Sequence, residues 1–276
     1  MNPVYLDVAR GVIALSVFGY ASYRDILERR VRDEVWYPLV AVGVVALGVD
    51  LLLLDTERVA VFTLISLIFG GVFGYFFYRV GAFGGADMKA IVVLSLLFPV
   101  YPDFWGLPVV RSEAGIFILT VLGNTVVAGA LYPLGLFVEN ILRHGFSNPV
   151  LMVVGRQVKV DDLHTRHGRI LRLPDESMTF SGTDLDFFRD YVDWRGVESL
   201  SDVDFSDLRL RRFVNETDWV TDDIENDEEE MRRILKAEKV WITPGIPFIV
   251  PMTVGLVVAL IYGDVVYAVL RWLFLT

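Results

Sequence analysis

The sequence contains no cysteine, and this absence removes several kinds of chemistry at once. Disulfide frameworks, zinc sites with thiolate ligands and thiol nucleophiles all require cysteine. Basic residues are also few: 25 Lys and Arg stand against 35 Asp and Glu, which gives a formal net charge of −10. Because binding to a phosphate backbone needs a basic surface, we expect no nucleic-acid partner.

The N-terminus lacks the basic start, short apolar segment and small-residue cleavage site of a signal peptide, so we interpret the first apolar run as a retained anchor. Apolar residues dominate the chain, at 54% hydrophobic and 13% aromatic, with a mean hydropathy of +0.50. A membrane-spanning helix takes about 20 such residues. Candidate runs lie at 4–23, 35–54, 59–78, 88–101, 114–138 and 246–261, the last extendable to 275. We therefore predict a polytopic α-helical membrane protein with about six transmembrane helices, embedded in the lipid bilayer of the cell membrane.

Lysines and arginines in the short loops predict the orientation of these helices, because cytoplasmic loops carry an excess of them. The first and third loops together hold six basic residues: Arg24, Arg29, Arg30, Arg32, Arg79 and Lys89. The second and fourth loops hold two, Arg58 and Arg111. Odd-numbered loops are therefore expected in the cytoplasm, and the N and C termini outside.

A polar insert at residues 139–245 separates the fifth and sixth predicted helices. It contains 23 Asp and Glu against 15 Lys and Arg, and loop parity makes it cytoplasmic. Its first half has the pattern of short strands at 150–154, 157–160 and 169–173. The acidic run at 222–230 followed by 231–239 suits a helix with acids at its N-terminus. We predict an acidic cytoplasmic domain of mixed or mainly β structure, inserted between helices 5 and 6 and flanked by membrane segments 1–138 and 246–276.

Five aspartates lie in or at the edge of predicted spans. An ionisable residue is energetically costly there and is therefore a candidate functional residue. Asp7, Asp50 and Asp264 fall near the outer ends, and we interpret them as solvated or snorkelling interface acids. Asp25 ends the first span and Asp87 opens the fourth. Two complete spans separate this second pair, so both carboxylates are expected at the cytoplasmic face.

Two neighbouring carboxylates cannot both ionise cheaply, so one keeps a proton. That arrangement supports aspartic protease chemistry, in which one carboxylate activates water and the protonated partner polarises the peptide carbonyl. The chemistry needs no metal and no cofactor, and we expect neither.

The segment before Asp87 is rich in glycine, reading Gly-Ala-Phe-Gly-Gly-Ala-Asp over residues 81–87. Glycine allows close approach of a neighbouring helix or an extended substrate. We therefore consider Gly84, Gly85 and Ala86 as substrate-positioning residues. An ordinary interhelical turn with Asp87 as a helix cap is the alternative interpretation of the same motif.

Three segments together resemble the archaeal prepilin (preflagellin) peptidases, membrane aspartic proteases of the GxGD class related to the bacterial type IV prepilin peptidases. They are YASYRDILERR at 20–30, GGADMK at 84–89 and WITPGIPFIVP at 241–251. The resemblance implies that Asp25 and Asp87 are the catalytic pair. The strict class motif has glycine directly before its aspartate, where this chain has Ala86, as in the looser archaeal form.

The resemblance also implies the activity: an aspartic endopeptidase that cleaves the short basic leader of prepilin or preflagellin (archaellin) precursors at the cytoplasmic face. Bacterial relatives that methylate the new N-terminus carry a Cys-rich segment, which is absent here, so no methyltransferase activity is expected. The acidic domain is expected either to attract the basic leader or simply to remain soluble because of its charge.

Other interpretations stay open at this point. Asp25 and Asp87 would also suit the proton relay of an ion-coupled transporter, although we find neither the internal repeat nor the midplane acids typical of one. A non-catalytic assembly scaffold leaves the two matched acids unexplained.

His164 and His167 are interpreted as solvated loop residues, since a zinc site needs convergent ligands. The prolines of 241–251 predict a broken entry into the last helix near the substrate path.

Overall fold

The computed structural model describes residues 3–28, 31–53, 56–80, 83–165, 168–172, 234, 237–244 and 247–275. It is mostly helical and divides into two compact units. The first comprises residues 1–131 and 247–276, and the second comprises residues 132–246.

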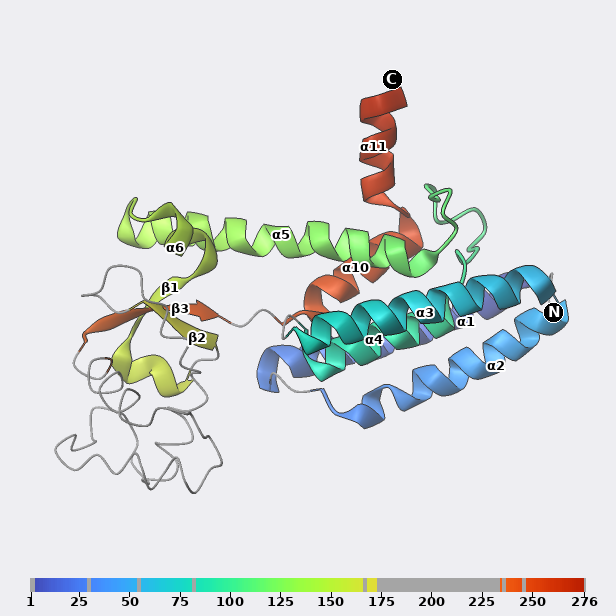
Figure 1. Cartoon of the computed structure of the whole chain (residues 1–276), viewed down its shortest axis with the longest axis horizontal. Helices are drawn as coiled ribbons and strands as arrows, with labels where there is room; N and C mark the ends of the chain where they lie inside the picture. Colours follow the sequence, from blue (N-terminus) through green and yellow to red (C-terminus); the bar gives the residue numbers. More distant parts are fainter. Residues whose placement is uncertain are drawn as a thin grey trace. The chain divides into compact units, whose positions relative to one another are not determined.

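The named elements described in the first unit are all helices. In chain order these are α1 (Pro3–Glu28), the short η1 (Asp33–Val35), α2 (Tyr37–Leu53), α3 (Thr56–Arg79), α4 (Gly85–Leu97), the first half of α5 (Phe117–His144), α10 (Ile249–Ile261) and α11 (Val265–Leu275). Helices α1 to α4 lie side by side, with α4 packed mainly on α3 and α2, and α10 packed on α1 (Figure 1). The buried core contains Phe18, Leu94, Phe98, Phe117 and Met252, drawn from four helices and the loop after α4.

Four helices in the described part of the chain are long and apolar enough to cross a membrane: α1, α2 with its preceding η1 turn, α3 and α5. Large apolar side chains on α2 and α3, such as Val45 and Val72, are exposed, as expected of helices that face lipid rather than water. The chain is thus a multi-pass membrane protein. The fourth predicted span is a helix of only 13 residues, α4, and α10 has the same length. The expected number of six spans is therefore not confirmed.

The last predicted span is interrupted, in place of the extension to 275 that the apolar run suggested. Helix α10 ends at Ile261, and Gly263 adopts a φ of +106°, a left-handed conformation that favours glycine. Asp264 then caps α11: its Oδ1 accepts the Tyr267 N–H at 2.8 Å and its Oδ2 accepts the Thr120 hydroxyl at 3.0 Å. Our interpretation of Asp264 as a solvated interface acid was wrong, because the helix break needs a buried cap.

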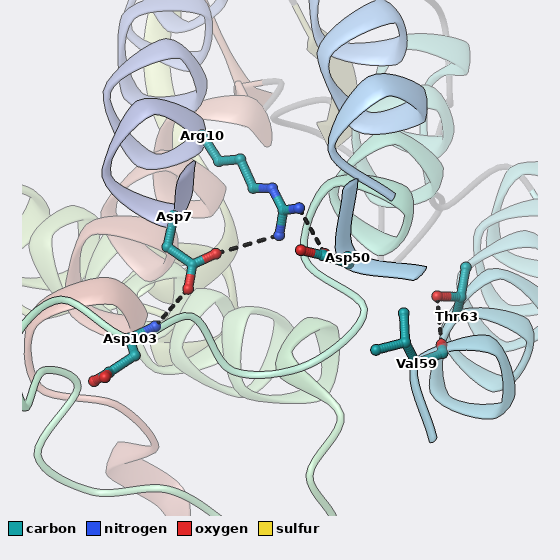
Figure 2. Close-up of polar contacts among 6 residues, drawn as sticks. All are labelled: Asp7, Arg10, Asp50, Val59, Thr63 and Asp103. Atoms are coloured by element: carbon teal, nitrogen blue, oxygen red, sulfur yellow. Dashed lines mark hydrogen bonds and ion pairs between the residues drawn. The ribbon is translucent and has the colours of Figure 1, made fainter. Parts of the chain in front are cut away.

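Asp7 and Asp50 are also not solvated, and an arginine explains why. Arg10 is 3% exposed, and it donates from Nη1 to Asp7 at 3.2 Å and from Nη2 to Asp50 at 2.6 Å. The second oxygen of Asp7 accepts the backbone N–H of Asp103 at 2.9 Å (Figure 2). This buried cluster joins α1, α2 and the loop after α4, so the interface interpretation of these two acids is corrected.

The Arg10 cluster and Asp25 lie at opposite ends of α1. Asp7 and Asp25 are 18 residues apart on one helix, which is roughly 27 Å at the rise of an α-helix. That length is close to the ~30 Å thickness of the hydrocarbon core.

Helices α5 and α10 approach closely at Gly255. A Cβ atom there would lie 2.7 Å from the Thr125 backbone nitrogen and 2.9 Å from the Val121 carbonyl oxygen. We expect Gly255→Ala to lower the free energy of unfolding by about 1–3 kcal/mol, since the backbone of α5 would have to shift. At Gly129 in the same interface a Cβ would meet Pro251 at 3.9 Å, an ordinary contact. Gly129→Ala is therefore the control. In thermal unfolding in detergent, its midpoint should equal or exceed that of the wild type. Equal midpoints for the two variants would contradict the prediction.

The second unit contains the end of α5, α6 (Pro149–Val154), β1 (Arg156–Lys159), η2 (Val160–Thr165), β2 (Gly168–Arg172) and β3 (Lys239–Pro244). The strands form an antiparallel sheet in the order β1-β3-β2. In its described strands, Ile242 of β3 pairs with Arg156 on one side and Ile170 on the other, and both isoleucines are buried.

Two of the three predicted strands are present, at 156–159 and 168–172. The third, at 150–154, is the helix α6 instead. Asn148 caps it by accepting the N–H groups of Val150 and Leu151, and Pro149 supplies a first-turn φ suited to a helix. Strand β3 was not predicted, and it begins at Lys239, which we had assigned to a helix. The acidic run of that expected helix lies outside the described residues.

Candidate active site

Asp25 lies in the last turn of α1, where α10 begins beside it. Its Oδ2 accepts the backbone N–H of Ile249, the first residue of α10, at 3.2 Å. One turn earlier on α1, the hydroxyls of Ser22 and Thr253 are 2.7 Å apart, and Thr253 also bonds to the Phe18 and Ile249 carbonyl oxygens. These hydroxyl contacts hold the start of α10 against α1, and so they position the Ile249 N–H that donates to Asp25.

Asp87 lies in the first turn of α4. Its Oδ2 accepts the N–H of Gly84, the residue that precedes the helix, at 2.8 Å. This is one half of a capping box, because glycine has no side chain with which to return the bond. Asp87 is thus held by the backbone of its own glycine-rich segment. The capping interpretation expected Asp87 itself at the N-cap, but Gly84 holds that position and Asp87 is the third residue of the helix. Its contact with Gly84 is compatible with a chemical role.

The two carboxylates lie near enough to influence each other electrostatically. Asp87 precedes the apolar run of α4, and burial raises the pKa of its carboxyl from 3.8 to about 6. The Gly84 hydrogen bond opposes the rise, and the negative charge of Asp25 adds to it. A carboxyl group that keeps its proton up to about pH 6, beside a second carboxylate, is the electrical arrangement of an acid–base pair.

The backbone of the other predicted site residues is unstrained. Gly84 is extended, at φ −75° and ψ 165°, and Gly85 and Ala86 are the first two residues of α4. A Cβ on Gly85 would lie 3.9 Å from the Tyr78 ring, an ordinary contact. Neither glycine is required by a left-handed conformation, so the substrate-positioning role of Gly84, Gly85 and Ala86 stays a prediction.

Sequence reasoning missed the groups that support Asp25: the Ile249 N–H, Ser22 and Thr253. A signal for the first was present, since prolines at 244 and 247 delay the start of the helix. A helix that starts there leaves unpaired N–H groups in its first turn for a nearby carboxylate. We expected segment 241–251 to lie near the substrate path, but we did not predict that its Ile249 N–H would donate to Asp25.

Two exposed ion pairs lie close to the aspartates in the sequence, and the predicted histidines belong to the second unit. Lys89 pairs with Asp33, and Arg24 pairs with Glu28, all four side chains being at least 30% exposed. His164 lies in η2, and His167 falls outside the described residues. Within the described ranges no group of three or more His, Cys, Asp or Glu is arranged to hold a metal ion.

Two family models match the chain in succession. Residues 12–134 match the type IV leader peptidase family, and residues 147–265 match the type II C-terminus of archaeal A24 peptidases. The first match contains both Asp25 and Asp87, and the second contains the start of α10. The chain belongs to the type IV leader (A24) peptidase family and is a membrane protease.

Curated relatives agree with this assignment. A preflagellin peptidase of Methanocaldococcus jannaschii is 22% identical over 262 residues, which are 92% of each chain. A preflagellin peptidase of Methanococcus maripaludis is 23% identical over 88% of this chain and 90% of its own. The prepilin peptidase EppA of Methanothermobacter thermautotrophicus is 28% identical over 42% of this chain and 31% of its own.

Proposed function

We propose that this protein is an aspartic endopeptidase that removes the leader peptide of prepilin or preflagellin precursors, with Asp25 and Asp87 as its catalytic residues. The observation that carries the proposal is the pair of mutually influencing carboxylates at the ends of α1 and α4, each held by one backbone N–H.

The two aspartates differ in surroundings, and this difference suggests separate roles. Asp25 faces the N-terminus of α10, whose partial positive charge and N–H donor favour a carboxylate. Asp87 has a raised pKa, so it is the partner that carries the proton. Asp25 is therefore the general base, and Asp87 is the acid that polarises the scissile carbonyl.

The reaction then balances without any further group. Asp25 takes a proton from water as the water oxygen attacks the carbonyl carbon, while Asp87 gives its proton to the carbonyl oxygen. When the tetrahedral intermediate collapses, the C–N bond breaks and the amine takes the proton from Asp25. The carbonyl re-forms and its hydroxyl proton returns to Asp87. No cofactor is needed, and we expect chelators to leave the rate unchanged.

The basic residues of the loops support a cytoplasmic location for this chemistry, with both termini outside and the 139–245 domain in the cytoplasm. The relatives named preflagellin and prepilin peptidase support precursors of those proteins as substrates. A precursor helix would lie in the bilayer beside the spans, with its leader at the carboxylates and its extended backbone along residues 84–86. The acidic domain would attract a basic leader, an effect weakened by salt.

The rate should depend on pH because Asp87 must carry a proton. Its pKa is raised from 3.8 to about 6, so the protonated fraction is lost as pH rises through that value. We expect kcat/KM to fall about tenfold per pH unit well above pH 6. Asp33→Asn, at an exposed ion pair near the site, is the control and should keep this decline. A rate that is constant between pH 5 and 9 would contradict the assignment of the acid.

The experiment that tests the function uses the whole protein in liposomes, a tagged precursor and mass spectrometry of the products. The expected result is a single cut between leader and hydrophobic helix, unaffected by EDTA. Failure to cut any precursor, together with proton flux across the liposome membrane, would favour the ion-coupled transporter in which the same aspartates relay protons.

A further inference from the structure

An aromatic pair joins the two segments that hold the aspartates. The rings of Phe83, in the loop before α4, and Phe248, at the start of α10, have centroids 4.5 Å apart and planes at 33°. The two residues are 165 positions apart in the sequence and belong to the same compact unit. Both side chains are partly buried and pack against the hydrophobic core.

Each ring lies one residue before a donor to an aspartate. Gly84, which follows Phe83, donates its N–H to Asp87 at 2.8 Å. Ile249, which follows Phe248, donates its N–H to Asp25 at 3.2 Å. Because the carbonyl of one residue and the N–H of the next share a planar peptide group, the position of each phenylalanine constrains the donor that follows it.

The pair is anchored on both sides. Phe83 packs on Phe77 of α3 with ring centroids 5.0 Å apart, and on Phe73 at 6.2 Å. The Phe248 carbonyl accepts the Met252 N–H at 3.2 Å within α10. The aromatic contact therefore connects α3, the loop before α4 and the start of α10 at the point where both carboxylates are held.

We propose that Phe83 and Phe248 are positioning residues: their ring contact sets the separation of the Gly84 and Ile249 donors and so the separation of Asp87 and Asp25. This inference rests on the proposed function of the two aspartates. An acid and a base that act on one water and one carbonyl must be aligned closely, and a displacement of about 1 Å costs on the order of a hundredfold in rate.

The test compares Phe83→Leu, Phe248→Leu and the double variant with Phe69→Leu. Phe69 stacks on Phe73 of the same helix with centroids 5.2 Å apart, so it loses a similar aromatic contact. Phe69 contacts neither donor segment among the described aromatic pairs. Phe83→Tyr keeps the ring and serves as the conservative variant.

In precursor cleavage we expect each pair variant to lower kcat about 10- to 100-fold with KM within twofold. The loss of kcat in the double variant should be no greater than in the more affected single variant, because one substitution already breaks the contact. Phe83→Tyr should keep a kcat close to that of the wild type. Phe69→Leu should lower the melting temperature without this loss of kcat. If Phe83→Leu and Phe248→Leu change the rate no more than Phe69→Leu does, or if their losses multiply, the inference is wrong.

A second measurement does not depend on cleavage. Isotope-edited infrared spectroscopy follows the titration of the Asp87 carboxyl, and we expect its midpoint to move in both pair variants and to stay in Phe69→Leu. Identical midpoints in all variants would overturn the positioning role. A wild-type protein that cuts no precursor would instead overturn the proposed function, so the two failures are distinguishable.

Discussion

Asp87→Asn and Asp25→Asn should each lower the rate of precursor cleavage by at least about a thousandfold, since each removes one half of the acid–base pair. Asparagine has nearly the shape of aspartate, and its carbonyl oxygen still accepts the N–H of Gly84 or Ile249. The fold should therefore remain, and a melting temperature near the wild-type value would exclude misfolding as the cause.

Matched controls for these variants lie close by. Asp33→Asn and Glu28→Gln each remove an acid from an exposed ion pair next to the site, with Lys89 and Arg24 respectively. Exposed pairs contribute little to stability, and neither acid bonds to a donor at the site. Both controls should cleave within about threefold of wild type. A control that loses as much activity as Asp25→Asn would show that removing any acid near the site disrupts it, and the assignment of the pair would fail.

Arg10→Met should cause the largest loss of stability, about 3–5 kcal/mol. The substitution leaves Asp7 and Asp50 buried at the end of α1 and α2 without the cation that lies between them (Figure 2). Removing one partner of a buried ion pair is costly because the remaining charge is neither solvated nor paired. Arg10→Lys should lose less, although a single ammonium lacks the fork geometry with which Arg10 reaches both acids.

Thermal or denaturant unfolding in detergent measures this effect. Arg111→Met is the control, because its ion pair with Asp103 is about half exposed and we expect a change below about 1 kcal/mol. If Arg10→Met unfolds at the same midpoint as Arg111→Met, the Arg10 cluster does not stabilise the bundle as its burial implies.

The sequence alone predicted most of the membrane part, for a physical reason. A bilayer imposes long apolar runs, so α1, α2, α3 and α5 were recognisable by length and hydropathy. The same rule left open whether the last run ends at 261 or continues to 275, because apolar residues lie on both sides of Gly263. Nor could it distinguish a solvated acid from a buried one: Asp7, Asp50 and Asp264 depend on partners 3 to 144 residues away.

The sequence suggested Asp25 and Asp87 from their expected position at one face and from the motifs around them, and their catalytic role stays a prediction. The supporting contacts were not predictable, because a backbone donor such as the Ile249 N–H carries no residue signature. In the second unit, the short valine-rich apolar run at 150–154 was assigned to a strand, but Asn148 and Pro149 start a helix there. Strand β3 escaped notice because the prolines at 244, 247 and 251 suggested only the entry into a helix.

The most direct test of the aspartate pair is the cleavage rate of the double variant, Asp25→Asn with Asp87→Asn, beside both single variants in the same liposomes. When two residues act as one acid–base unit, the effects of substituting them on the rate are strongly non-additive, since loss of either residue already abolishes the shared step. We predict that the double variant cleaves at the same residual rate as each single variant. A single variant that cleaves at the wild-type rate, or a double variant whose loss is the product of the two single losses, would contradict the account.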